Sequence, residues 1–83
     1  MKNITMYTLS TCPWCKKTKK YFKDHNIPFN FIDYDLADKD VQEKILSEMR
    51  ANGANGFPFV KIEDKIVVGY RPEEYSRILG ISS

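Results

Sequence analysis

A short β-like run that leads directly into a helix-like run is the feature that most constrains the fold of this chain. Ile4–Thr8 is rich in β-branched and aromatic residues, which predicts a strand. Residues 9–11 are loop-like, and Pro13 suits the first position of a helix, where its missing N–H breaks no intrahelical hydrogen bond. The junction predicts a strand that turns into a helix, with Cys12 and Cys15 at the helix start.

Cys12 and Cys15 are the only cysteines among the 83 residues. Two thiols one helical turn apart can close a disulfide and open it again, so the pair predicts a thiol–disulfide redox site. The alternative without function is a pair of inert, buried cysteines. A zinc site within one chain would need about four ligands, and the single histidine, His25, falls a few turns along the helix. We therefore expect no metal, although this argument leaves open a cluster shared between two chains.

The helix start also predicts which sulfur attacks first. A free thiol has a pKa near about 8.5, whereas the unpaired N–H groups and the dipole of a helix N-terminus favour the thiolate. The dipole supplies roughly 0.3–1 kcal/mol, less than the ~1.4 kcal/mol of one pKa unit. Hydrogen bonds to sulfur and lysines such as Lys16 must supply the rest of any large shift. We expect Cys12 to attack and form a mixed disulfide, and Cys15, less exposed and with a more ordinary pKa, to resolve it.

Charge and length restrict the class of protein. The net charge of +2 is too small to predict nucleic-acid binding, and no apolar run approaches the about 20 residues that span a bilayer. We expect one domain, residues 1–83, in a monomeric cytoplasmic protein that binds no membrane. The helix after the cysteines concentrates positive charge, which either stabilises a thiolate and attracts anions or forms a solvated face. Its lysines are Lys16, Lys17, Lys19, Lys20 and Lys23.

The remaining pattern predicts an α/β fold with the element order βαβαββα. The first two strands should be parallel and the last two an antiparallel hairpin, which gives a four-stranded mixed sheet with helices on both faces. Helices should begin at Pro13, after a capping Asp38, and at Pro72. The expected strands are Ile4–Thr8, Phe29–Tyr34, Pro58–Ile62 and Lys65–Val68. By spacing, the expected core includes Tyr7, Phe22 and Phe31.

A second constellation surrounds Phe57 and Pro58. A proline at the first residue of a strand is permitted by itself, and a trans bond is the ordinary interpretation because only about 5–6% of X–Pro bonds are cis. A cis Phe57–Pro58 bond would instead turn the backbone groups of Phe57 outward, where an extended thiol substrate could pair with them.

With these features in place, the chain resembles the glutaredoxins over nearly its whole length. That family places a Cys-Pro-[Tyr/Phe]-Cys-type motif after the first strand, a cis proline at the third, and a Gly-Gly pair after the fourth. The counterparts here are Cys12–Cys15, Pro58, and Gly69 with Tyr70. The resemblance implies a thioredoxin-like fold, glutathione as reductant, protein or glutathione mixed disulfides as substrates, and a cis Pro58. The expected binding residues are Pro13, Trp14, Phe57, Pro58, Gly69, Tyr70 and Arg71.

The chain departs from the family where glutathione binds. Leu9 stands where glutaredoxins commonly place a lysine, and Gly56–Pro58 replaces Thr-Val-Pro. Gly69–Glu73 reads Gly-Tyr-Arg-Pro-Glu and is similar to the Gly-Phe-Arg-Pro-Asp of NrdH-redoxins, which receive electrons from thioredoxin reductase and reduce ribonucleotide reductase. NrdH-redoxins, however, typically carry Cys-Val-Gln-Cys. The alternatives are therefore an NrdH-type redoxin and, third, a dimeric iron–sulfur carrier.

Two of the expected binding residues have open roles. Arg71 either holds a carboxylate of glutathione or has a structural or surface role. We expect Trp14 to be exposed, with its aromatic face against either a partner protein or its own domain.

Overall fold

The computed structural model of the chain describes residues 3–81, and its elements follow the predicted order. The strands are β1 (Ile4–Thr8), β2 (Asn30–Asp33), β3 (Phe59–Ile62) and β4 (Lys65–Val68). The helices are α1 (Pro13–Asp24), α2 (Lys39–Ala51) and α3 (Pro72–Leu79), and a 3₁₀ helix, η1 (Tyr34–Leu36), follows β2. Of these described helices, none is both long and apolar enough to cross a bilayer.

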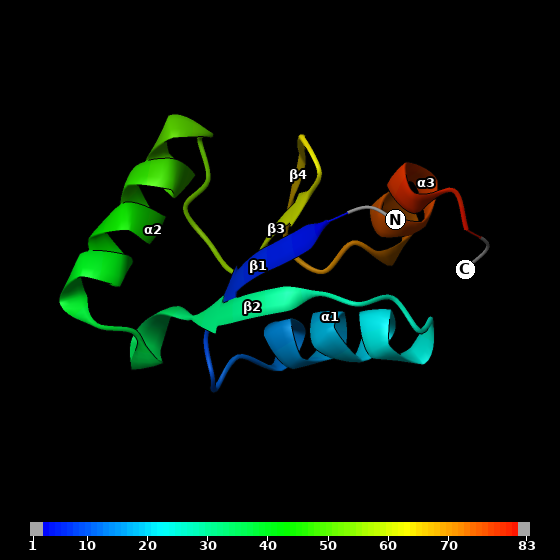
Figure 1. Cartoon of the computed structure of the whole chain (residues 1–83), viewed down its shortest axis with the longest axis horizontal. Coiled ribbons are helices and arrows are strands. Elements are labelled where there is room, and N and C mark those ends of the chain that lie inside the picture. Colours follow the sequence, from blue (N-terminus) through cyan, green and yellow to red (C-terminus); the bar gives the residue numbers. More distant parts are fainter. Residues whose placement is uncertain (1–2, 82–83) are drawn as a thin grey trace.

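The strands form one mixed sheet of order β2-β1-β3-β4. β1 runs parallel to β2 and antiparallel to β3, and β3 and β4 form the predicted hairpin. Helix α2 covers one face of the sheet, while α1 and α3 lie on the other (Figure 1). The predicted four-stranded sheet with helices on both faces is confirmed.

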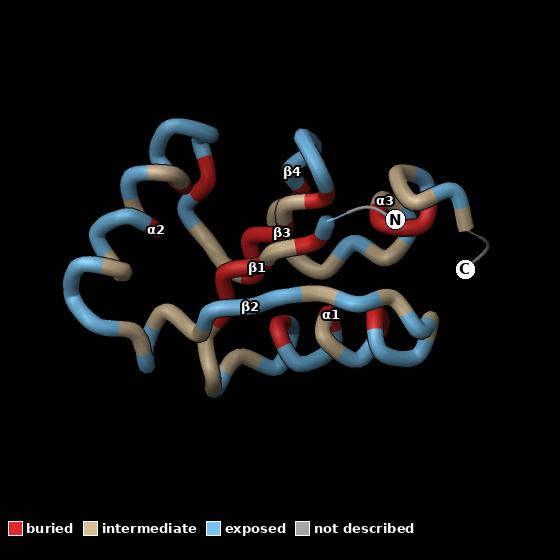
Figure 2. The backbone as a smooth tube through the Cα atoms, viewed as in Figure 1, coloured by how far each residue is buried: buried red, intermediate tan, exposed pale blue. Residues whose placement is uncertain are grey.

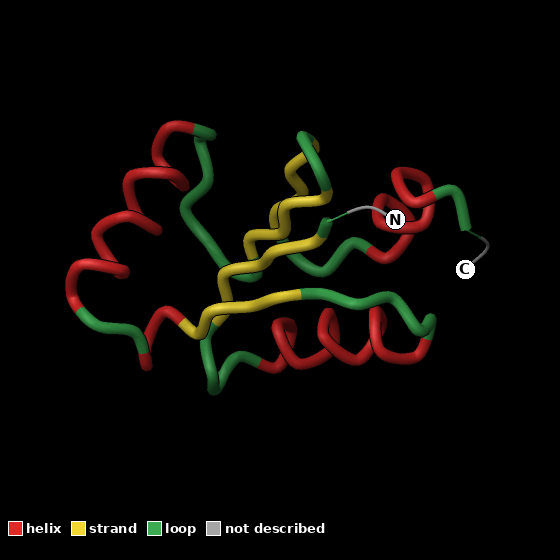
Figure 3. The backbone as a smooth tube through the Cα atoms, viewed as in Figure 1, coloured by secondary structure: helices red, strands yellow, loops and turns green. Residues whose placement is uncertain are grey.

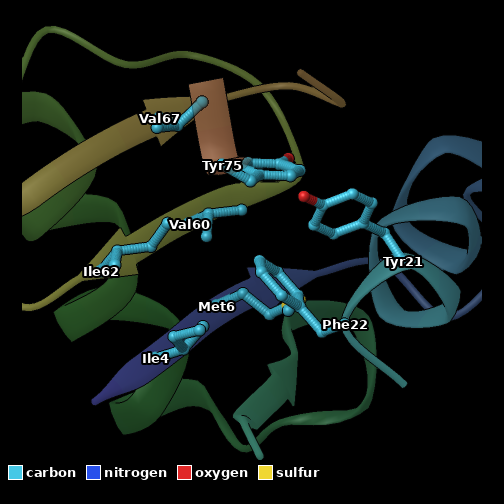
Figure 4. Packing of buried hydrophobic residues seen from close by; sticks show 8 residues of the cluster. All are labelled: Ile4, Met6, Tyr21, Phe22, Val60, Ile62, Val67 and Tyr75. Atoms are coloured by element: carbon cyan, nitrogen blue, oxygen red, sulfur yellow. The ribbon is translucent and has the colours of Figure 1, made fainter. Parts of the chain in front are cut away.

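Each face of the sheet has its own core because side chains alternate along a strand. Met6 points toward α1 and α3, whereas its neighbour Tyr7 points toward α2. Burial is concentrated on the central strands β1 and β3, as Figure 2 shows. The larger cluster, drawn in Figure 4, consists of Ile4, Met6, Tyr21, Phe22, Val60, Ile62, Val67 and Tyr75. The cluster beneath α2 consists of Tyr7, Ile45, Met49, Ala54 and Phe59.

The prediction of core positions is confirmed for Tyr7 and Phe22 and is wrong for Phe31. Phe31 is 45% exposed because β2 is an edge strand with β1 as its one neighbour in the sheet. The Nζ atom of Lys19 lies 3.8 Å from the centre of the Phe31 ring, so a lysine of α1 partly covers it. The second strand is also shorter than predicted, because Tyr34 turns into η1 instead of continuing β2.

Helix boundaries follow local chemistry. Asp38 caps α2 as predicted, and its Oδ1 accepts a hydrogen bond of 2.9 Å from the backbone N–H of Val41. Pro72 occupies the first turn of α3, and Gly80 ends this helix with a φ of 71°, a left-handed conformation that glycine adopts without steric cost.

Removal of the Asp38 cap should destabilise the protein. We expect Asp38→Ala to lower the free energy of unfolding by about 1 kcal/mol, since one helix N–H loses its side-chain acceptor. Urea denaturation followed by circular dichroism measures this loss. Asp40→Ala is the matched control, because Asp40 lies in the same first turn without serving as the cap. Equal losses in the two variants would contradict the capping role.

Candidate active site

Cys12 is the N-cap residue of α1. A short loop connects β1 to the start of this helix (Figure 3). The backbone of Cys12 is extended, with φ −82° and ψ 120°, and Pro13 occupies the first turn as predicted. The Cys12 N–H donates to the carbonyl of Leu9 at 3.2 Å, which closes the loop. The Cys12 thiol is half-buried, whereas that of Cys15 is completely buried.

Hydrogen bonds hold the pKa of Cys12 below its ordinary value. Partial burial acts against the thiolate, but the backbone N–H of Cys15, the thiol of Cys15 and the backbone N–H of Trp14 outweigh it. The Cys15 N–H lies 3.4 Å from the Cys12 sulfur and donates to it. Two of these donors are free N–H groups of the helix start, as the sequence predicted, and the third is the Cys15 thiol.

Cys15 differs from the expected ordinary pKa. The pKa of Cys15 is raised to about 12, with burial as the largest cause and the neighbouring Cys12 as a smaller one. The Leu9 N–H, 3.5 Å from the Cys15 sulfur, and the positive charge of Lys19 act in the opposite direction but do not offset burial. The structure thus separates the two thiols by environment: one sulfur ionises readily and the other holds its proton.

The lysines of α1 have different surroundings from one another. Lys16 is exposed, and the groups that lower the pKa of Cys12 are N–H donors and a thiol rather than a lysine ammonium. Lys19 forms an ion pair of 3.1 Å with Asp33, and Lys17 places its Nζ atom 4.5 Å from the centre of the Trp14 ring. The basic helix is therefore partly engaged with its own domain.

A groove beside the start of α1 brings together most of the predicted binding residues. It has a volume of about 400 Å³. Trp14 is 54% exposed, as expected, and its ring stacks on Tyr70 with centroids 6.0 Å apart. The lining residues are Trp14, Phe57, Val68, Gly69, Tyr70 and Arg71. Val68 was not among the predicted binding residues, because the alternation of a short strand does not show which end faces a groove.

The two prolines among the predicted binding residues, Pro58 and Pro13, differ in their burial and in their position relative to the groove. The Phe57–Pro58 bond is cis, which confirms the expectation from the resemblance, and Pro58 itself is fully buried. The Pro58 carbonyl accepts a hydrogen bond of 2.8 Å from the N–H of Gly69, and this bond ties the entry of β3 to the exit of β4. Pro13, in contrast, is exposed at the helix start and does not line the groove.

Arg71 lies at the rim of the groove with a contact of its own. Its Nε–H donates to the Val68 carbonyl at 3.1 Å, and the side chain is exposed. The terminal N–H groups form no ion pair within residues 3–81. One donor is thus structural, while a guanidinium retains further donors that suit a carboxylate.

A contact with η1 anchors the loop before Cys12. Both the backbone N–H and the hydroxyl of Ser10 donate to the carboxylate of Asp35, the former at 2.8 Å. The Ser10 hydroxyl, through its hydrogen bond, is the largest cause that holds the pKa of Asp35 below its ordinary value. In the sequence, Asp35 is one acid among several, and nothing there signals this contact. Among the described residues, no three His, Cys, Asp or Glu side chains gather in a group that could hold a metal ion.

Comparison with known proteins agrees with this arrangement. The glutaredoxin family model matches residues 4–67. A glutaredoxin-like 8.6 kDa protein from the rubredoxin operon of Clostridium pasteurianum is 40% identical over 77 residues, which make up 92% of this chain and 96% of that protein. The crystal structure of a glutaredoxin from Methanosarcina mazei Go1 matches with a TM-score of 0.87 and 36% identity, over 95% of this chain and 79% of its own.

The NrdH-redoxin of Escherichia coli is a second kind of structural relative. Its structure matches with a TM-score of 0.78 and 28% identity, over 92% of this chain and 93% of its own, and is described as the basis of a thioredoxin-like activity profile. Together with the glutaredoxin structure, this match confirms the predicted thioredoxin-like fold.

The contrast between the thiols predicts two different pH profiles of alkylation. In Cys15→Ser, iodoacetamide should modify Cys12 with a midpoint below the ordinary thiol pKa of about 8.5, because the rate follows the thiolate and the backbone donors remain. In Cys12→Ser, the midpoint for Cys15 should lie well above that value, because its burial is unchanged. Mass spectrometry of the alkylated protein against pH measures both midpoints. Coincident midpoints would contradict the assignment.

Proposed function

The chain belongs to the glutaredoxin family of thiol–disulfide redox proteins, and we propose that Cys12 and Cys15 make it a dithiol oxidoreductase. One observation carries this proposal: a half-buried thiol with a lowered pKa accepts a hydrogen bond from the backbone N–H of Cys15, whose own thiol is buried and has a raised pKa. The proposed substrates are disulfide-containing proteins and mixed disulfides of glutathione.

The proposed reaction consists of two exchanges. The Cys12 thiolate attacks one sulfur of the substrate disulfide, forms a mixed disulfide with it and expels the other sulfur as a thiolate, which takes up a proton. Cys15 then loses its proton and attacks the Cys12 sulfur. The Cys12–Cys15 disulfide forms, and the bound substrate sulfur leaves as a thiol after protonation. Two electrons pass to the substrate, and an external thiol donor must return them.

The first exchange changes the electrostatic surroundings of Cys15, the thiol that acts in the second exchange. Cys12 raises the pKa of Cys15 both through its hydrogen bond and through its charge. Once the Cys12 sulfur is part of a mixed disulfide it carries no charge, so these two effects weaken and the pKa of Cys15 falls. The charge of Lys19 continues to favour the Cys15 thiolate. Burial, the largest cause of the raised pKa of Cys15, remains, so the first exchange removes a part of the barrier to ionisation of the resolving thiol.

For the groove we propose a role in substrate binding. Trp14, Phe57 and Tyr70 supply apolar walls, Gly69 leaves the backbone open, and Arg71 offers donors for a carboxylate. Pro13 and Pro58 act by shaping the helix start and the entry of β3. Lys16 remains a proposed thiolate-stabilising residue of lesser weight, because N–H donors already surround the sulfur.

Glutathione is the proposed reductant, in the cytoplasm, and thioredoxin reductase is the alternative. The alternative is favoured by Leu9, which offers no ammonium group for a glutathione carboxylate, and by the pattern of Gly69–Glu73. Similarity to the E. coli NrdH-redoxin supports it as well, and ribonucleotide reductase would then be a partner. A cluster bridged between two chains is the third and weakest alternative.

Serine variants test the order of attack. Cys12→Ser should reduce the rate of disulfide reduction to the uncatalysed level, because the attacking sulfur is absent. Cys15→Ser should still attack a protein disulfide but accumulate the mixed disulfide, which non-reducing electrophoresis and intact mass measure. If Cys12→Ser keeps the full rate, the proposed dithiol chemistry is wrong.

The electron donor is identified by following NADPH consumption with insulin as the disulfide substrate. We expect turnover with glutathione and glutathione reductase, because the groove and Arg71 offer a site for the tripeptide. Reactions with thioredoxin reductase alone, and with each reductase but without this protein, are the controls. Turnover with thioredoxin reductase alone would overturn the assignment to glutathione while leaving the dithiol chemistry intact.

A further inference from the structure

Helix α3 contributes a tyrosine to the core whose hydroxyl reaches toward the groove. Tyr75 is completely buried, and its ring lies beside that of Tyr21, with centroids 5.5 Å apart (Figure 4). The Tyr75 hydroxyl donates to the carbonyl of Gly69 at 2.5 Å. Burial raises the pKa of Tyr75 above its usual value, so the hydroxyl keeps the proton that it donates.

The same hydroxyl also meets α1. The Thr18 Oγ1 atom lies 3.4 Å from the Tyr75 hydroxyl oxygen and donates to the Trp14 carbonyl at 3.0 Å. The proton of Tyr75 is directed to Gly69 and that of Thr18 to Trp14, so the two hydroxyl oxygens lie in contact with both protons already committed. This contact places Tyr75, and with it Gly69, beside the first turn of α1.

Gly69 is the residue on which these contacts converge. Its N–H donates to the Pro58 carbonyl at 2.8 Å and its own carbonyl accepts from Tyr75, so both of its backbone polar groups are held. Its φ of 94° is a conformation that residues with a side chain rarely adopt. The next residue is Tyr70, whose ring stacks on Trp14. The position of Gly69 therefore determines where the Tyr70 wall of the groove stands.

We propose that Tyr75 is a positioning residue of this site: its hydroxyl holds Gly69, and through it Tyr70, at a fixed distance from the cysteine-bearing turn of α1. This inference rests on the proposed function in assigning the groove to the substrate. Tyr75 does not itself line the groove but contacts Gly69, which does, so it acts through Gly69. Without the hydroxyl, the aromatic ring at position 75 still fills the core, but Gly69 loses its hydrogen bond and Tyr70 is no longer held in place.

The test compares Tyr75→Phe with Tyr21→Phe. Both tyrosines belong to the same core cluster, and each donates or shares one buried hydrogen bond; the hydroxyl of Tyr21 meets Ser76 at 2.5 Å, away from the groove. Urea denaturation first establishes that the two variants are folded and similarly destabilised. A glutathionylated peptide serves as substrate, with the electron donor that supports the wild-type protein.

We expect Tyr75→Phe to raise KM about three- to tenfold, the equivalent of one lost buried hydrogen bond, with kcat and the pKa of Cys12 unchanged. Tyr21→Phe should keep the wild-type KM. Trp14 is the only tryptophan of the chain, so acrylamide quenching of its emission gives a second readout of the Trp14–Tyr70 stack. Quenching should increase in Tyr75→Phe and stay at the wild-type level in Tyr21→Phe.

Equal KM and equal quenching in the two variants would overturn the inference, because Tyr75 would then be one more core aromatic. If the wild-type protein reduces no disulfide, the proposed function fails, and quenching alone decides the positioning role. If Tyr75→Phe does not fold, Tyr75→Met removes the same hydroxyl with a side chain that adapts to the space left in the core. It must then increase the quenching of Trp14 above that of Tyr21→Met, and equal values would again overturn the inference.

Discussion

Packing of α1 and α3 against one face of the sheet is the constraint on which the site depends. Phe22 of α1 belongs to the core cluster on this face, and its ring centroid is 5.1 Å from that of Tyr75 of α3. This aromatic contact sets α1 beside α3, so the first turn of α1 lies next to the loop that leads into α3. Because the groove is formed between these two segments, core packing and the shape of the groove depend on the same few side chains.

The two cysteines at the start of α1 differ only in their surroundings. Helix α1 begins just after Cys12, so free N–H groups of its first turn face the Cys12 sulfur. Cys15 lies one turn further along the helix and is buried in the core. The first arrangement stabilises a thiolate and the second destabilises it. The contrast between the two pKa values thus arises mainly from burial and from donors at the helix start, while Lys16 is exposed nearby.

The neighbourhood of the site combines features of two groups of relatives. The cysteine motif matches the glutaredoxins, whereas Gly69–Glu73 is similar to the NrdH-redoxins, and structures of both groups match this fold. Leu9 contributes its backbone N–H to Cys15 and has no charged side chain to offer. Arg71 retains donors for a carboxylate but commits its Nε–H to the Val68 carbonyl. Under the proposed function, the choice of reductant would depend on the groove rather than on the cysteines.

The order of elements, the helix start at Pro13, the cap at Asp38 and the paired thiols could be predicted from the sequence, because each depends on residues close together in the chain. The cis bond before Pro58 was expected from the resemblance, and the order of attack is a prediction from local chemistry. Packing between distant segments leaves Phe31 on an open edge and buries Cys15, which raises the pKa of its thiol. The same packing brings Asp35 to the loop before Cys12 and Tyr75 to Gly69. These properties arise from residues that are distant in sequence, and the spacing of side chains along one segment carries no information about which other segment will cover it.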